Sequence, residues 1–195
     1  TGMRIGELTA LQWDDIDFEN KEIHIRHSMQ SAYLNGKKIL NMTTPKTSNS
    51  IRDIPMFDGV EKLFVFWKEK QDKAKKELGR RWRLPKEFEN LVFTSSLGSP
   101  LTRYVLSNDI NKIVSILNKN EEYLAEQENR VPKKFPKLHP HSFRHTFATR
   151  CFEKNLKPVF IMSIMGHSNY ETTLSYTHLL KKSNDQQVSL AGSFV

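Results

Sequence analysis

The spacing of the apolar residues changes along this chain, and that change restricts the fold more than any other feature of the sequence. Near the front, apolar and polar residues alternate in the runs EIHIRH, KKILNM and SIRDIP, which is the pattern of half-buried strands. The pair Asn35-Gly36 favours a tight turn, and the polar residues from Lys46 to Ser50 favour a loop. We therefore predict a small antiparallel sheet, with residues 91–93 as one further short strand.

Elsewhere the apolar residues recur at every third or fourth position, which is the pattern of one helix face. A short helix is expected from Arg4 to Leu11, where Ile5 and Leu8 have this spacing. The other expected helices span residues 57–78, 102–117, 142–154, 157–165 and 170–180. The charged stretch from Asn118 to Lys137 has few apolar residues, so we expect a surface excursion there. The predicted fold class is thus mainly α with a small antiparallel β-sheet, an α+β arrangement.

Length and composition favour a single domain. A chain of 195 residues, 37% of them apolar, is long enough to bury one core. It opens at Thr1 without an initiator methionine, so we expect a piece of a longer protein. There is neither a run of about 20 uncharged apolar residues nor a secretion signal, and we expect a soluble, cytoplasmic protein with no membrane contact. Cys151 is the only cysteine, which excludes an internal disulfide and a cysteine-based zinc cluster.

The charge of the chain points to the class of its partner. The formal net charge is +8, which favours a polyanion such as nucleic acid. Many basic proteins use their lysines only for solubility, so charge alone leaves both interpretations open. Basic residues that could contact phosphates, but that we leave outside the catalytic set, are Lys37, Lys38, Arg52, Arg103 and Lys133.

A histidine- and arginine-rich run, HPHSFRHTFATR, occupies residues 139–150. Its spacing places His141 and Arg144 on one side of the first turn of a helix, where both could donate to one anion. Alternatively, His141 pads the helix and Arg144 pairs with a carboxylate. His141 and His145 also have the spacing of helical zinc ligands, to be completed by another histidine (His139, His167 or His178). Arg144 would repel a cation there, and no carboxylate stands where a metalloprotease needs its base, so we expect no metal.

Four motifs occur together and in a fixed order: TGMRIGEL, TPKTSNSIRDIP, HPHSFRHTFATR and MGHSNYETTLSYTH. In this order and at these intervals the chain resembles the tyrosine recombinase (phage integrase) family, especially the integrases of phages and conjugative transposons. The resemblance covers nearly all of residues 1–178 and implies the catalytic-domain fold of tyrosine recombinases. Residues 179–195 would be a C-terminal tail, which in relatives packs onto a neighbouring protomer.

The resemblance also implies a catalytic set of six residues. These are Arg4, Lys46, His141, Arg144, His167 and Tyr176. Two guanidinium groups suit a phosphate because they form paired, charge-assisted hydrogen bonds and stabilise the charge of a five-coordinate phosphorus. Taken one at a time, three of these residues have simpler explanations. Lys46 could be a solvated loop lysine, Tyr176 could lie at the edge of a core helix, and His167 could simply follow a helix end.

The family's chemistry assigns a role to each group. Tyr176 attacks the phosphate and needs help, because a phenol has an ordinary pKa of about 10. His141 accepts its proton, Lys46 protonates the leaving 5′ oxygen, and His167 donates to a non-bridging oxygen. Glu7, one helical turn after Arg4, either orients an arginine or histidine of the site or is an ordinary surface carboxylate.

The implied function is site-specific cleavage and rejoining of DNA through a 3′-phosphotyrosine, for integration or excision of a mobile element. No cofactor is implied. The partners would be double-stranded DNA recombination sites, occupied by a homotetramer whose subunits are monomers in isolation. The alternatives are a type IB topoisomerase, which the hairpin and MGH motifs resemble less, and a non-catalytic DNA-binding relic, which would not need all six residues.

Overall fold

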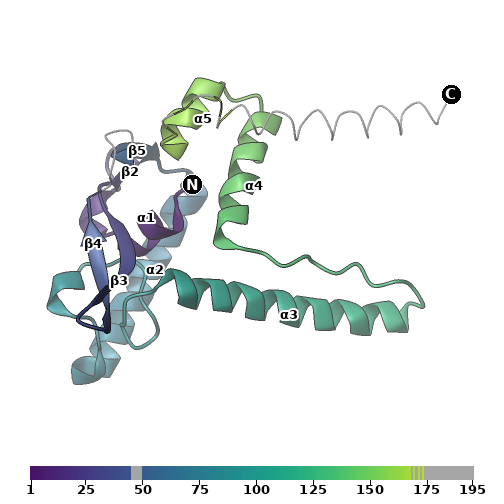
Figure 1. Cartoon of the computed structure of the whole chain (residues 1–195), viewed down its shortest axis with the longest axis horizontal. Coiled ribbons are helices and arrows are strands. Elements are labelled where there is room, and N and C mark those ends of the chain that lie inside the picture. The colour runs from purple at the N-terminus through teal and green to yellow at the C-terminus, as the bar shows by residue number, and fades with distance from the viewer. Residues whose placement is uncertain (45–49, 168, 170, 172, 174–195) are drawn as a thin grey trace.

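The computed structural model describes residues 1–44, 50–167, 169, 171 and 173 of the chain. Two antiparallel sheets lie near the N-terminus (Figure 1). The first sheet has the order β1-β2-β5, formed by Ile16–Asp17, Glu22–Ile25 and Arg52–Pro55. The second is a hairpin of β3 (Ser28–Leu34) and β4 (Lys37–Thr43). The predicted antiparallel strands are confirmed, but they are divided between two sheets rather than joined in one.

The hairpin includes a strand that the sequence pattern did not predict. β3 contacts solvent along most of its length, so its sequence, SMQSAYL, lacks a regular apolar side. The turn between β3 and β4 is at Asn35-Gly36, as predicted, and both residues have positive φ angles, 50° and 74°. The predicted strand at residues 91–93 does not form as a strand; Leu91 makes only an isolated bridge to Gln12.

Five α-helices account for most of the described remainder of the chain. They are α1 (Ile5–Ala10), α2 (Asp58–Leu78), α3 (Arg103–Gln127), α4 (Pro140–Glu153) and α5 (Pro158–Met165). Their starts agree with the predicted ones to within two residues. The helix expected at residues 170–180 lies largely outside the described residues. Among the described residues, no helix is both long and apolar enough to span a bilayer.

α3 continues ten residues past the predicted end at Leu117, so the expected excursion from Asn118 is partly wrong. Its additional turns are held by the chain segment that follows the helix. Glu121 accepts hydrogen bonds from Arg130 and from the backbone N–H of Lys133, and Asn118 pairs with the backbone of Phe135. Figure 1 shows this segment, residues 128–139, running from the end of α3 to α4. The periodicity missed these turns because they contact the following segment through polar side chains, while their large apolar residues, Tyr123 and Leu124, remain exposed.

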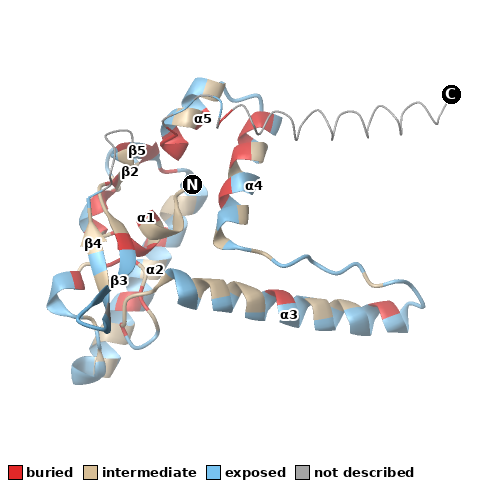
Figure 2. Cartoon of the chain, viewed as in Figure 1, coloured by how far each residue is buried: buried red, intermediate tan, exposed pale blue. Residues whose placement is uncertain are grey.

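Figure 2 shows where the buried residues lie, and two of the apolar clusters that they form meet at α5, while a third joins α1 and β3 to Phe88 and Leu91. The larger cluster packs the inner face of the three-stranded sheet against α2, with Ile23, Ile54 and Phe64 nearly inaccessible. A second cluster joins α4 to α5 through Phe152 and Ile161. α5 contributes to both, since Ile164 belongs to the first cluster and Met165 to the second. Burial of each such side chain is worth about 1.5–3 kcal/mol, so the C-terminal end of α5 is firmly placed.

Candidate active site

Three arginines from three different elements donate to the C-terminal end of α5. Arg52 Nε donates to the carbonyl of Ile164 (2.5 Å), Arg144 Nη2 to that of Met165 (2.5 Å) and Arg4 Nη2 to that of Gly166 (2.7 Å). The last carbonyls of a helix lack partners within the helix and carry a partial negative charge. α5 ends there because Gly166 adopts the left-handed conformation, with φ 61° and ψ 46°. One helix end therefore gathers three guanidinium groups from distant parts of the sequence.

The two arginines predicted for the site differ in exposure. Arg144 is 3% exposed, and its Nη1 also donates to the carbonyl of Gly2 (2.6 Å). Arg4 is the residue before α1, and its side chain is 39% exposed. Main-chain carbonyls thus hold both arginines in one small region, and Arg4 is held by a carboxylate as well.

Glu7 lies beneath these arginines and is not a surface carboxylate, because its side chain is only 4% exposed. Its Oε1 accepts from Arg4 Nη1 (2.9 Å), and its two oxygens form a paired contact with Arg52 Nη1 and Nη2 (3.0 and 2.8 Å). Burial raises the pKa of Glu7, but the hydrogen bonds and charge of Arg52 and the hydrogen bonds of Arg4 outweigh it, so the pKa is below its ordinary value. Glu7 is therefore ionised and bridges two arginines.

His167 follows Gly166 directly and is buried among the same charges. Its Nδ1 lies 2.9 Å from Thr173 Oγ1, and Thr173 is itself inaccessible to solvent. Burial, and then the positive charges of Arg144, Arg4 and Arg52, lower the pKa of His167 from 6.5 to about 4. The imidazole is therefore neutral at neutral pH, and one of its nitrogens carries a proton that it can donate.

His141 is in the first turn of α4, as predicted, and is exposed. Its ring contacts the ring of His145 edge-on, with centroids 4.4 Å apart. Burial, followed by the charges of His145, Arg144 and other arginines, lowers the pKa of His141. His141 is therefore within the electrostatic influence of Arg144 and mostly neutral at neutral pH, the form that accepts a proton.

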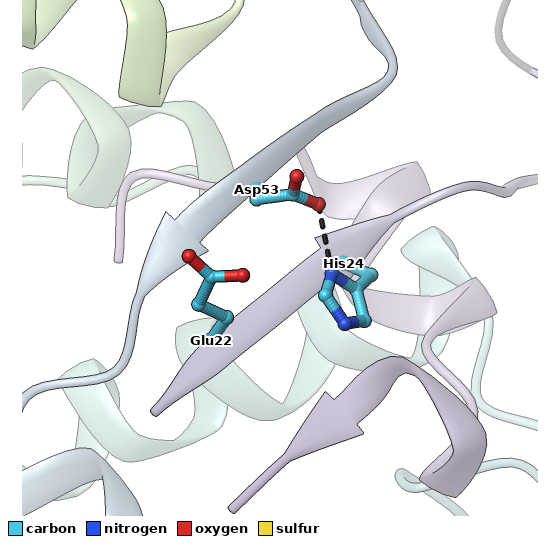
Figure 3. A group of neighbouring side chains, drawn as sticks. All are labelled: Glu22, His24 and Asp53. Atoms are coloured by element: carbon cyan, nitrogen blue, oxygen red, sulfur yellow. Dashed lines mark hydrogen bonds and ion pairs between the residues drawn. The ribbon is translucent and has the colours of Figure 1, made fainter. Parts of the chain in front are cut away.

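The zinc alternative for the histidine pair gains no support from the described residues. There the only group of three metal-capable side chains is Glu22, His24 and Asp53, on the outward face of β2 and β5 (Figure 3). His24 Nδ1 lies 2.8 Å from Asp53 Oδ1, and Arg26 Nη2 donates to the same oxygen (2.7 Å). Because Asp53 already pairs with a guanidinium group, ion pairing accounts for this cluster.

Two of the predicted catalytic residues, Lys46 and Tyr176, lie outside the described residues. Of the remaining set, the structure brings Arg4, Arg144 and His167 together at the end of α5, with Glu7 beneath them. The catalytic set from the sequence omitted Arg52. The run SIRDIP did indicate where Arg52 lies. Arg52 is two residues before Ile54, so in a strand both side chains occupy the same, inward face.

A groove of about 670 Å³ adjoins Arg4. It lies between α1, the β3–β4 hairpin and the N-terminal end of α3. Polar and basic residues along it are Ser28, Gln30, Ser31, Thr102, Arg103, Tyr104 and Ser107. α1 approaches β3 so closely that a Cβ atom on Gly6 would lie 2.6 Å from Ser28 Oγ. The groove is therefore lined by both polar and apolar side chains, and Arg4 forms part of its wall.

Comparisons with known proteins agree with the motifs. The sequence pattern of the Phage integrase family matches residues 1–183. The chain is 30% identical, over 96% of its length, to a "Tyrosine recombinase XerC-like" protein of Caldanaerobacter subterraneus subsp. tengcongensis, and 30% identical, over 90%, to the "Transposase from transposon Tn916" of Enterococcus faecalis. It spans only 45% and 39% of the length of these relatives.

Among solved structures, the Tn1549 transposon integrase in complex with a circular intermediate DNA superposes with a TM-score of 0.72 at 30% identity, over 90% of this chain and 50% of that one. The predicted fold class and the resemblance of the motifs are thereby confirmed. The chain belongs to the phage integrase family of tyrosine recombinases.

Proposed function

We propose that residues 1–178 form the domain of a site-specific recombinase that cuts and rejoins DNA, with Tyr176 as the nucleophile. The observation that carries this proposal is the meeting of Arg4, Arg144 and His167 at the end of α5. These are the described residues to which the family's chemistry assigns contacts with the scissile phosphate. The relatives, which include transposon integrases, support the same reaction.

The charge of the site suits a phosphate whose negative charge increases during the reaction. The three guanidinium groups carry three positive charges, and Glu7, which pairs with Arg4 and Arg52, carries one negative charge. Positive charges held close together repel one another, and an anion bound beside them relieves that repulsion. Arg4 and Arg144 would therefore bind the non-bridging oxygens most strongly when phosphorus is five-coordinate.

The histidines and the lysine would move or share protons in this scheme. His167, neutral because its pKa is about 4, would donate a hydrogen bond to a non-bridging oxygen. His141, whose pKa is also lowered, would accept the phenol proton of Tyr176. Lys46 would protonate the leaving 5′ oxygen. The product would be a 3′-phosphotyrosine, and attack by another 5′-hydroxyl would reseal the strand.

The DNA strand would pass along the groove beside Arg4, where Arg103 and several hydroxyl groups are placed to contact flanking phosphates. The formal net charge of +8 supports binding of a polyanion. We propose that the partners are two double-stranded recombination sites held by a homotetramer, with residues 179–195 packing onto a neighbouring protomer. Since the relatives are bacterial and phage proteins, the reaction would occur in the cytoplasm.

The test of this proposal is covalent capture on DNA. The protein expressed from its full gene is incubated with a nicked duplex that carries the junction site of the genetic element around that gene. Wild type is expected to form a protein–DNA adduct that survives denaturing electrophoresis, whereas Tyr176→Phe is expected to form none. Tyr123→Phe, at an exposed tyrosine of α3, is the matched control and should form the adduct normally. An adduct formed by Tyr176→Phe would exclude this tyrosine as the nucleophile.

A further inference from the structure

Arg52 is buried within the site, although it is a strand residue outside the family's six. Its side chain is 7% exposed. Nε donates to the carbonyl of Ile164, Nη1 to that of Ser50 (3.1 Å), and both Nη atoms pair with Glu7. These contacts use four of the five N–H bonds of a guanidinium group. Arg52 is therefore committed to contacts within the protein and is a poor candidate for direct contact with DNA.

The partners of Arg52 come from three stretches that lead to proposed catalytic groups. Glu7, 45 residues away in sequence, also holds Arg4. Ile164, 112 residues away, is followed directly by Met165 and Gly166, whose carbonyls accept from Arg144 and Arg4 respectively. Ser50 is the fourth residue after Lys46. Arg52 thus contacts three segments of the chain: the helix that follows Arg4, the end of α5 that holds Arg4 and Arg144, and the residues that follow Lys46.

The sharing of Glu7 explains how Arg52 acts on Arg4. Each carboxylate oxygen of Glu7 accepts one hydrogen bond from each arginine, because Oε2 also accepts from the backbone N–H of Arg4 (2.7 Å). Without Arg52, the charge of Glu7 would be balanced by Arg4 alone. The carboxylate would then be free to turn toward Arg4 and compete with a phosphate for the same N–H groups.

We propose that Arg52 is a positioning residue, which holds Glu7 and the end of α5 so that Arg4 and Arg144 meet the scissile phosphate in the reactive arrangement. The inference rests on the proposed function and adds a residue to it. A buried Arg–Glu pair contributes little net stability compared with an apolar replacement of the same shape, so a positioning role accounts for charges in this place better than stability does.

The test separates DNA binding from the rate of cleavage at saturating DNA. With the protein from the full gene and the nicked duplex, Arg52→Lys and Arg52→Gln are expected to bind with a Kd within about 3-fold of wild type. Their cleavage rates should fall by about 10-fold and about 100-fold, because a displacement of about 1 Å in a reacting group has effects of this size. Arg52→Lys keeps a positive charge beside Glu7. If Arg52→Gln is poorly folded, the cleavage rate of Arg52→Lys is therefore the measurement that tests the positioning role.

The matched control is Arg150→Gln, which removes a guanidinium–carboxylate contact between Arg150 and Glu153 on the exposed side of α4. It should cleave at the wild-type rate. Wild-type rates in both Arg52 variants, or weaker binding with an unchanged rate at saturation, would overturn the positioning role while leaving the proposed function intact. Failure of wild type to form any adduct would instead overturn the proposed function and this inference with it.

A double-variant cycle tests the route through Glu7. If Arg52 acts on Arg4 by way of Glu7, the protein carrying both Glu7→Gln and Arg52→Gln should cleave no more slowly than the slower single variant. Losses that simply multiply would show that Arg52 acts independently of Glu7, contrary to the proposal.

Discussion

Gly2 holds a backbone conformation that few other residues adopt, with φ of 71°, and its carbonyl accepts a hydrogen bond from Arg144. A Cβ atom there would lie 2.5 Å from Cδ1 of Phe147, so any side chain must displace the ring of Phe147 or the N-terminal segment. The packing of Gly2 against Phe147 therefore determines the position of a carbonyl that orients Arg144.

We expect Gly2→Ala to destabilise the fold by about 2–4 kcal/mol, the sum of left-handed backbone strain and overpacking, and to slow formation of the covalent adduct. The measurement is the free energy of unfolding in urea together with the cleavage rate. Gly36→Ala is the matched control, since Gly36 also has a positive φ, 74°, but has open space around its Cα. Equal effects of the two variants would show that the contact with Phe147 is unimportant.

His167 gives a second prediction at this scale, in the dependence of stability on pH. Its pKa in the folded protein is about 4, whereas the ordinary value is 6.5. Between these values the unfolded chain binds a proton at this histidine and the folded chain does not, so stability falls as the pH drops from 6.5 to 4. We expect the loss of stability between pH 7 and pH 4.5 to be smaller in His167→Gln than in wild type, measured by urea unfolding.

Carboxylates titrate in the same range, but they contribute to wild type and variant alike. His139→Gln, at an exposed histidine just before α4, should retain the wild-type loss. A loss in His167→Gln as large as in wild type would mean that the imidazole is already protonated, or is solvated, in the folded protein.

Single residues also show where sequence patterns stop being informative. The parity of Arg52 with Ile54 indicated an inward side chain, but no pattern indicated that Glu7 would meet it. For Glu7 itself, the sequence left open whether the carboxylate orients an arginine or faces solvent. The pairing depends on how α1 and β5 are placed relative to each other, and that is a property of the assembled core rather than of either segment.

At the scale of elements, the groove between α1, the β3–β4 hairpin and the start of α3 leads to a prediction about DNA binding. Arg103, the first residue of α3, lines this groove. We expect Arg103→Gln to weaken binding of duplex DNA about equally for all sequences and to reduce the slope of log Kd against log salt by about 1, as loss of one phosphate contact requires. Binding is measured by fluorescence anisotropy over a series of salt concentrations.

Arg150→Gln is the matched control, because Arg150 is an exposed arginine near the end of α4 that pairs with Glu153. It should leave the salt slope unchanged. If both variants reduce the slope equally, the basic surface acts as a whole and the groove has no special part in binding.

A helix or strand was predictable from the sequence where its bounds depend on its own residues. The end of α5 was predicted correctly because glycine favours the left-handed conformation of Gly166, whereas α4 begins at Pro140, two residues before the predicted start at Ser142. β3 and the last turns of α3 were not predictable in this way, since their partners are the exposed β4 strand and the segment that includes Arg130. Such contacts with neighbouring segments leave no regular apolar spacing.

At the scale of the whole molecule, the site is built from contacts between residues very far apart in sequence. Arg4 and Gly166 are separated by 162 residues, and Arg144 and Gly2 by 142. Periodicity predicts each helix but carries no information about such meetings, so the grouping of Arg4, Arg144 and His167 was predictable only from the order of family motifs. The structure supplies the reason for the grouping, which is a shared helix end placed by two apolar clusters.

The three arginines at the end of α5 have a consequence for how this protein can change during evolution. Each residue of a helix turns the chain by about 100° and advances it by about 1.5 Å. Insertion or deletion of one residue within α5 would therefore point the last three carbonyls in new directions and withdraw the acceptors of Arg4, Arg52 and Arg144 at once. We therefore expect the number of residues between Pro158 and Gly166 to be retained, whereas exposed side chains of α5 such as Val159 can vary.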